Sequence, residues 1–169
     1  AKARLLTENA QIVPHGARVW AAPVQSDELR HRFTVDRAAG FDVSSFNILA
    51  DRRVIQLELS GVEYQELAPP FVALELSFNK DFELLGEQSE TIAIEAGGRL
   101  DGFVLWYELL LGGGVSLSTA PTERGTHWRQ GFLPQWGESE CLETGDQMAV
   151  NTQYRRYLLW FDAVRVARR

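Results

Sequence analysis

Alternation of apolar and less apolar residues at a period of two is the feature that most constrains the fold of this chain. Ile55, Leu57 and Leu59 each follow a less apolar residue, and large apolar side chains recur at every second position over residues 72–78. Successive side chains of a β-strand point to opposite faces of the sheet. The pattern therefore predicts strands that each have one apolar face.

Further runs of this kind are separated by glycine-containing turns, and Gly112-Gly113-Gly114 is the most pronounced of them. Many short strands joined by hairpins predict an all-β fold, an antiparallel β-barrel or sandwich. We expect one short helix, over residues 26–32, with Ser26 as its N-cap. The further strands that we expect cover residues 17–24, 91–95, 102–111, 115–117, 127–133, 147–152 and 157–166.

A chain of 169 residues is long enough for one domain with a substantial core. Side chains of equal parity within the alternating strands share a face, so they predict the core. The predicted core consists of Leu57, Leu59, Leu74, Leu76, Phe103, Leu105, Leu158 and Trp160. We also expect much of the core to come from four tryptophans, Trp20, Trp106, Trp136 and Trp160.

Charge and cysteine content exclude several classes of protein. The formal net charge is −6, and basic residues gather only in the short tail 165–169, so we expect no nucleic-acid partner. Cys141 is the single cysteine, which leaves no intrachain disulfide and no support for an oxidising compartment. No apolar run has the length of a membrane span. We therefore expect a cytoplasmic protein without a membrane partner.

Motifs for cofactor, metal or nucleophile chemistry are missing from the sequence. It contains neither a phosphate-binding loop nor a G-x-G-x-x-G fingerprint. His15, His31 and His127 stand alone, without a second ligand at the spacing that a zinc site needs. Glu138 and Glu140 fit a solvated loop better than a catalytic pair. A nucleophile with its base, or a pair of catalytic carboxylates, is defined by positions in space and not by spacing along the chain, so the motifs leave such chemistry open. We expect no metal site.

Thr126, His127 and Trp128 form the most informative short motif, after a strand-like run and a small-residue turn. One interpretation makes Trp128 a core residue of a strand and His127 its solvent-facing neighbour. The other makes the motif a binding loop, because an aromatic face with charge-assisted hydrogen bonds holds a planar guanidinium well. The residues themselves leave both interpretations open.

The order of the motifs resembles the C-terminal half of the protein arginine methyltransferases. The motifs that carry the resemblance are Gly40-Phe41-Asp42-Val43-Ser44, Asp101-Gly102-Phe103-Val104-Leu105-Trp106-Tyr107, Leu117-Ser118-Thr119-Ala120-Pro121, Thr126-His127-Trp128-Arg129-Gln130 and Leu142-Glu143-Thr144-Gly145-Asp146. The resemblance implies that residues 15–169 form the family's β-barrel domain. It implies that residues 1–14 are the last piece of the preceding methyltransferase domain or a linker.

What the resemblance implies about function is specific. Thr126, His127 and Trp128 would correspond to the loop that helps form the pocket for the substrate arginine, with His127 tied to a carboxylate of the other domain. The partners would be an N-terminal Rossmann-like methyltransferase domain and an arginine-containing protein substrate. S-adenosylmethionine would be the cofactor of the parent enzyme. This chain, which lacks the donor-binding loop and the catalytic glutamates, would bind none and would be inactive alone.

Residues 33–51 would form a shortened version of the family's dimerisation arm, with Phe41, Asp42 and Phe46 as candidate contacts. So short an arm predicts an isolated chain that is monomeric or weakly associated, and it leaves dimerisation of the parent open. The alternative to an enzyme module is a non-enzymatic β-sandwich that binds carbohydrate or protein. Trp20 or Trp136 would then be a stacking platform.

Overall fold

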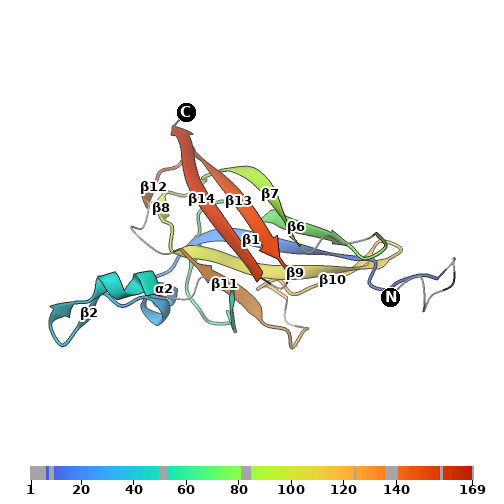
Figure 1. Cartoon of the computed structure of the whole chain (residues 1–169), viewed down its shortest axis with the longest axis horizontal. Helices are drawn as coiled ribbons and strands as arrows, with labels where there is room; N and C mark the ends of the chain where they lie inside the picture. Colours follow the sequence, from blue (N-terminus) through green and yellow to red (C-terminus); the bar gives the residue numbers. More distant parts are fainter. Residues whose placement is uncertain are drawn as a thin grey trace.

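The computed structural model describes residues 7, 10–49, 53–80, 85–123, 125–135, 141–156 and 158–168. Over these residues the chain consists mainly of β-strands, and every strand pairing is antiparallel (Figure 1). The all-β class predicted from the alternation is confirmed. No helix in the described ranges is both long and apolar enough to cross a membrane.

The larger sheet is organised around β1 (Gly16–Gln25) and β9 (Gly102–Gly112), which pair along almost their whole lengths. Strands β4, β11 and β10 extend it on the β9 side, and β5 and β6 extend it on the β1 side. The bounds of these strands are β4 (Ile55–Leu57), β5 (Gln65–Glu66), β6 (Phe71–Ser77), β10 (Val115–Ser118) and β11 (Gln130–Pro134).

A second sheet, in the order β14-β13-β7, packs across one face of the larger sheet (Figure 1). Phe103 of the larger sheet meets Phe161 of the second sheet edge to face, with ring centroids 4.9 Å apart. The three strands are β7 (Leu85–Ala93), β13 (Asp146–Arg155) and β14 (Leu158–Arg168). Two further small sheets have two strands each. One pairs β8 (Gly98–Arg99) with β12 (Cys141–Leu142), and the other pairs β2 (Arg37–Ala38) with β3 (Phe41–Asp42).

A second hydrophobic cluster covers the opposite face of the larger sheet. There α2 (Asp27–Phe33) inserts the fully buried Leu29, and the ring of Phe33 stacks on Phe132 of β11 at 5.7 Å. The first half of β9 is consequently buried on both sides, with Phe103 facing one cluster and Val104 the other. A strand buried on both faces has no polar face, which explains why this stretch is continuously apolar in sequence.

The predicted core is confirmed at five of its eight positions, and the three misses are Leu76 of β6 and both predicted residues of β14. Leu57, Leu59, Leu74, Phe103 and Leu105 are buried, whereas Leu76, Leu158 and Trp160 are half-buried. In β14 the buried ring is that of Phe161, and Leu159 packs beside it. The run from Leu158 to Phe161 is apolar at every position, so alternation gives no parity there.

The tryptophans do not dominate the core, contrary to the prediction. Trp20, Trp106 and Trp160 are only half-buried, and Trp136 lies outside the described residues. Trp20 and Trp106 stack with centroids 6.4 Å apart, and the Trp20 indole N–H donates to Glu108 at 3.2 Å. A large ring with a polar N–H suits such a partly exposed place, and phenylalanines fill the interior instead.

Helix α2 begins as predicted at Ser26, whose Oγ accepts the Leu29 N–H at 3.2 Å. The backbone N–H of Ser26 donates to the Asp101 carboxylate at 2.8 Å, and Arg99 Nε donates to the same carboxylate at 2.6 Å. The first turn of the helix is therefore fixed to the residue that precedes β9. It leads into the arm, residues 34–49, which contains β2, β3 and the 3-10 helix η1 (Ser44–Leu49).

The turn between β9 and β10 confirms the interpretation of Gly112-Gly113-Gly114 as a hairpin. The three φ angles are 105°, 61° and 78°, which lie in the region that favours glycine.

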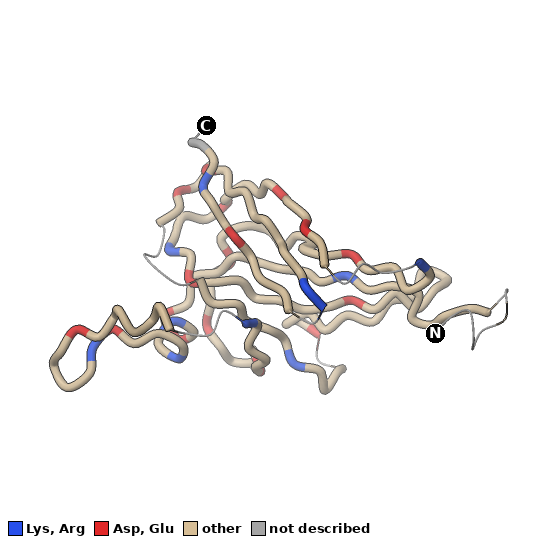
Figure 2. The backbone as a smooth tube through the Cα atoms, in the orientation of Figure 1, with Lys and Arg blue, Asp and Glu red and all other residues tan. Residues whose placement is uncertain are grey.

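Charged residues of both signs are interspersed along the chain (Figure 2).

Candidate functional site

The Thr-His-Trp motif lies in an excursion from the larger sheet, outside the strands. We call residues 120–123 and 125–129 the Thr-His-Trp loop; it follows β10 and leads into β11, which begins only at Gln130. The predicted strand over residues 127–133 thus begins three positions later than expected. Trp128 is 47% exposed, His127 is exposed and Thr126 is half-buried. The interpretation of Trp128 as a core residue is therefore wrong.

One ring contact supports Trp128 from the side of the sheet. Its indole lies 5.4 Å from the ring of Tyr107 in β9, at an interplanar angle of 45°. Burial against the sheet raises the pKa of the Tyr107 hydroxyl. The pair places a large aromatic surface at the edge of the larger sheet, where a second molecule or domain could contact it.

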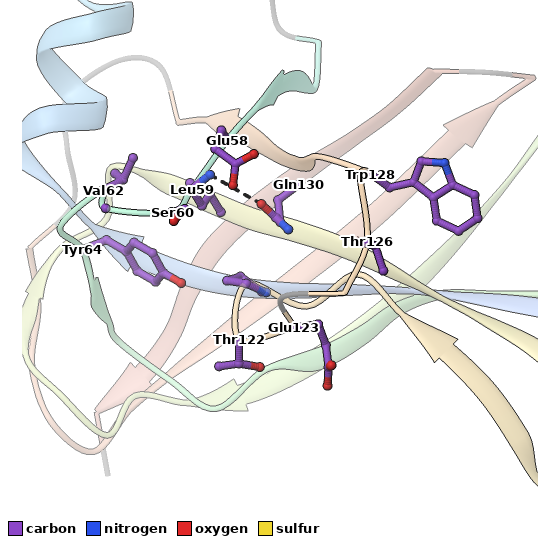
Figure 3. A pocket seen from close by; sticks show the side chains of 12 residues that line it. Glu58, Leu59, Ser60, Val62, Tyr64, Thr122, Glu123, Thr126, Trp128 and Gln130 are labelled. Carbon is purple, nitrogen blue, oxygen red and sulfur yellow. Dashed lines mark hydrogen bonds between the residues drawn. The ribbon is translucent and has the colours of Figure 1, made fainter.

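A pocket of about 620 Å³ opens beside the loop. Its two walls are the segment after β4, residues 58–64, and the Thr-His-Trp loop, which face each other in Figure 3. Buried Leu59 and Gln130 lie at its base. The lining residues are Glu58, Leu59, Ser60, Gly61, Val62, Tyr64, Pro121, Thr122, Glu123, Thr126, Trp128 and Gln130.

The charge of the described lining is negative. Glu58 lies on one wall and Glu123 on the other, and the lining contains no Lys, Arg or His among the residues that the structure describes. Tyr64 adds an aromatic ring, and burial together with the charge of Glu66 raises the pKa of its hydroxyl. Carboxylates beside aromatic rings favour a cationic ligand, because both attract positive charge.

The part of the chain that the structure describes holds no group of three or more metal-ligating side chains. The three histidines are in different settings: His15 is half-buried just before β1, His31 Nδ1 contacts the Asp27 carbonyl at 2.6 Å within α2, and His127 is exposed on the loop. The predicted carboxylate loop around Glu138 and Glu140 lies outside the described residues.

The predicted arm contacts lie in a different part of the molecule from the loop. The arm projects from the end of the larger sheet at the left of Figure 1, with Phe41 at 73% and Phe46 at 63% exposure. The carboxylate of Asp42 accepts the Ser44 backbone N–H at 3.0 Å and the Ser44 hydroxyl at 2.7 Å, which lowers its pKa. Asp42 thus caps the start of η1.

Sequence reasoning missed residues on both surfaces. Ile48 and Leu49 of η1 are 80% and 78% exposed, and no apolar periodicity marked them because η1 buries no side chain. Glu58 and Tyr64 reach the pocket through strand pairing, since β4 is far from the loop in sequence but pairs with β11. Gln130 belongs to the motif Thr126-His127-Trp128-Arg129-Gln130, but the sequence assigns it no place in the pocket.

Comparison with known proteins gives a family match over most of the chain. The model of the "arginine methyltransferase oligomerization subdomain" matches residues 15–161. An "Arginine N(omega)-methyltransferase" of Streptomyces achromogenes subsp. streptozoticus is 30% identical over 134 residues, which cover 79% of this chain and 37% of that protein.

Two further relatives are animal proteins. "Protein arginine N-methyltransferase 7" of Caenorhabditis briggsae is 25% identical over 180 residues, covering 95% of this chain and 27% of the relative. The protein of the same name from Drosophila virilis is 30% identical over 131 residues, covering 70% of this chain and 18% of the relative. The chain thus spans well under half the length of these relatives.

Proposed function

Because the chain belongs to the arginine methyltransferase family through its oligomerization subdomain, we propose that it is the substrate-side β module of a protein arginine methyltransferase. The parent reaction would move the methyl group from the sulfonium of S-adenosylmethionine to a guanidinium nitrogen, with loss of one proton from that nitrogen and release of S-adenosylhomocysteine. The observation that carries the proposal is the exposed Trp128 beside an acidic pocket, on a loop that the module's own core does not use. Such a surface suits a flat cation.

The module's contribution is to position the acceptor. The guanidinium group is planar and charged at neutral pH. Holding it in the right orientation to the methyl donor supplies much of the rate advantage in such reactions. Trp128 and the wall that carries Glu58 would line the approach of the arginine. The exposed imidazole of His127 would be held by a carboxylate of the methyltransferase domain, which fixes the loop against that domain.

The methyl donor does not fit the residues described here. The only α-helix in the described ranges is α2, and the buried carboxylate of Asp101 already occupies its N-terminus by accepting the Ser26 N–H. A Rossmann-like site for the donor would need a glycine-rich turn between a strand and a helix. S-adenosylmethionine would therefore be held by the preceding Rossmann-like domain, and the catalytic carboxylates would come from that domain as well.

The names of the relatives distinguish two acceptors. The Streptomyces relative is named for arginine, whereas the animal relatives are named for protein arginine. Free arginine carries an α-carboxylate and an α-ammonium side by side, so Glu58 and Glu123 would repel one charge and attract the other. The charge of the pocket therefore does not separate the two acceptors. A protein substrate is the first candidate, because two of these three relatives are named for it, and free arginine is the second.

The arm provides the surface for assembly. Phe41 and Phe46 are exposed there together with Ile48 and Leu49, and large exposed apolar groups of this kind mark interaction sites. We propose that the arm contacts a second copy of the full-length protein, in the cytoplasm. The isolated chain, which lacks the domain that the arm would contact, would be monomeric or weakly associated.

The test uses the full-length methyltransferase that contains this chain, with labelled S-adenosylmethionine and either an arginine-containing peptide or free arginine. We expect Trp128→Ala to lower kcat/KM for the peptide at least about tenfold, because a displaced acceptor loses its positioning. Trp160→Ala, which removes a half-buried indole from the second sheet, is the matched control. Full activity of a folded Trp128→Ala enzyme would contradict the proposal.

The chain alone supplies a second test. Titration calorimetry with S-adenosylmethionine should give no heat beyond dilution, and the isolated chain should transfer no methyl group. Saturable binding at micromolar concentration would refute the assignment of the donor site to another domain. Faster methylation of free arginine than of any peptide would select the second candidate.

A further inference from the structure

The Thr-His-Trp loop leaves the edge of β9 and returns to it almost at the same place. Thr119 donates its backbone N–H to the carbonyl of Tyr107 at 2.9 Å, and Gly131 pairs with Leu105. The loop therefore projects from a narrow neck. Thr119 forms one side of this neck and Gln130 the other.

The side chain of Gln130 closes the neck. Its Nε2 donates to the Thr119 carbonyl at 3.0 Å, and its Oε1 accepts the Leu59 backbone N–H at 3.4 Å. Only this orientation of the amide gives both atoms complementary partners, since the reverse would oppose two donors and two acceptors. Gln130 is 7% exposed, so neither backbone group has easy access to water as a substitute.

The bond to Leu59 reaches the opposite wall of the pocket. Leu59 follows β4 and belongs to the segment 58–64, and the dashed line of Figure 3 shows its N–H meeting Gln130 between the two walls. The Gln130 amide thus joins the neck of the loop to the facing wall just beyond the β11–β4 ladder, in which Gln130 pairs with Leu57. It extends the contact between the two walls past the end of that ladder.

The loop has little else to hold its functional end. Trp128 is 47% exposed and makes its ring contact with Tyr107 alone among the described aromatic residues. Neither His127 nor Trp128 forms a side-chain hydrogen bond within the described part of the chain. Order in this segment must therefore come largely from the neck.

We infer that Gln130 is a positioning residue, which presets the Thr-His-Trp loop within the β module before any other domain contacts it. Removing its amide leaves the Thr119 carbonyl and the Leu59 N–H buried without partners, and the neck opens to let water reach them. Trp128 then loses its fixed place against Tyr107. The consequence for arginine binding rests on the proposed function, whereas the preset loop is a property of this chain.

Two substitutions separate the two hydrogen bonds. Gln130→Leu preserves volume and removes both bonds, and Gln130→Glu keeps an acceptor for Leu59 but cannot donate to Thr119 when ionised. Gln88→Leu is the matched control. The half-buried amide of Gln88 likewise donates to a backbone carbonyl, that of Val72 at 3.2 Å, but it lies on β7 of the second sheet.

Nuclear magnetic resonance of the chain decides the inference. In Gln130→Leu the Leu59 amide should exchange with solvent at least about fivefold faster, as expected for the loss of one hydrogen bond. Nuclear Overhauser contacts between the Trp128 and Tyr107 rings should disappear. Gln130→Glu should lose the ring contacts and retain slow exchange at Leu59, and Gln88→Leu should change neither. Ring contacts that persist in the folded Gln130→Glu chain would overturn the inference, including when Gln130→Leu fails to fold.

Kinetics of the full-length enzyme test the consequence separately. A loop that is ordered only part of the time weakens apparent affinity, so Gln130→Glu should raise KM for the peptide about fivefold while kcat changes less than about twofold. An unchanged KM alongside lost ring contacts would overturn the role in substrate positioning. A wild-type enzyme without methyl transfer would refute the proposed function and leave the resonance result to decide the loop.

Discussion

The arm and the Thr-His-Trp loop are both excursions from the larger sheet, and they are held in different ways. The arm continues from α2, whose Leu29 is fully buried and whose Phe33 stacks on Phe132. The loop rises from a neck that the Gln130 amide closes. The arm thus rests mainly on apolar contacts, with the Asp101 carboxylate at the start of α2 as an addition, whereas the loop rests on hydrogen bonds.

The difference matches the tasks that we propose for them. Burial of apolar side chains contributes a large free energy and does not depend on precise orientation. It suits an arm that presents Phe46 and Ile48 to a partner. Hydrogen bonds are weaker in net free energy but directional, which suits a loop that must hold one ring at one place. Both excursions share β11, because Phe132 supports the arm and Gln130 supports the loop.

The largest effect should come from the arm's foundation. Phe132→Ala removes a fully buried ring between β9, β11 and α2, and we expect the free energy of unfolding to fall by roughly 3–5 kcal/mol. Chemical denaturation of the isolated chain measures this loss. A loss below 1 kcal/mol would show that α2 does not depend on this ring, and the comparison would fail.

A smaller loss should follow Asp101→Asn, which neutralises the carboxylate that binds Ser26 and Arg99 at the start of α2. The carboxylate side chain is 1% exposed, so lost charge-assisted bonds should cost about 1.5–3 kcal/mol. Asp162→Asn, on the exposed face of β14, is the control. Equal melting temperatures for the Asp101→Asn and wild-type chains would contradict this account of how the arm is anchored.

Loss of the loop's aromatic side chain should matter less for stability. Trp128→Ala removes a side chain that is 47% exposed, so we expect a change within about 1 kcal/mol in the isolated chain. Thermal melts check this expectation. Severe destabilisation would mean that the loop is part of the core, and any loss of activity would then follow from unfolding.

The smallest effect on stability should be at the tip of the arm. Phe46→Ser with Ile48→Ser changes exposed side chains, and we expect the free energy of unfolding to shift by no more than about 0.5 kcal/mol. Sedimentation of the full-length protein should show weaker self-association for this variant. Unchanged association would remove the arm from the assembly surface.

Particular elements show how far the sequence could be interpreted without the structure. Alternation located β4 and β6, and the cap at Ser26 located α2. The same reasoning failed in β14, where consecutive apolar residues carry no parity. It also extended β11 back to His127, since the letters of a short aromatic stretch do not show where strand pairing begins.

The candidate site divides in the same way. The Thr-His-Trp motif could be singled out from its letters, and so could Phe41 and Phe46 of the arm through the family resemblance. The acidic wall could not, because Glu58 reaches the loop only through the pairing of β4 with β11. Nor could the bridge from Gln130 to Leu59, whose partners are far apart along the chain.

Local chemistry was enough to predict the strand period, the helix cap, the glycine hairpin at residues 112–114 and the motif on the loop. Each depends on neighbouring residues and on backbone sterics. Only the folded chain shows which face of β14 is buried, which wall faces Trp128 and what closes the neck of the loop. These features depend on pairing between distant strands, because burial and hydrogen bonding are settled by whatever the folded chain brings together.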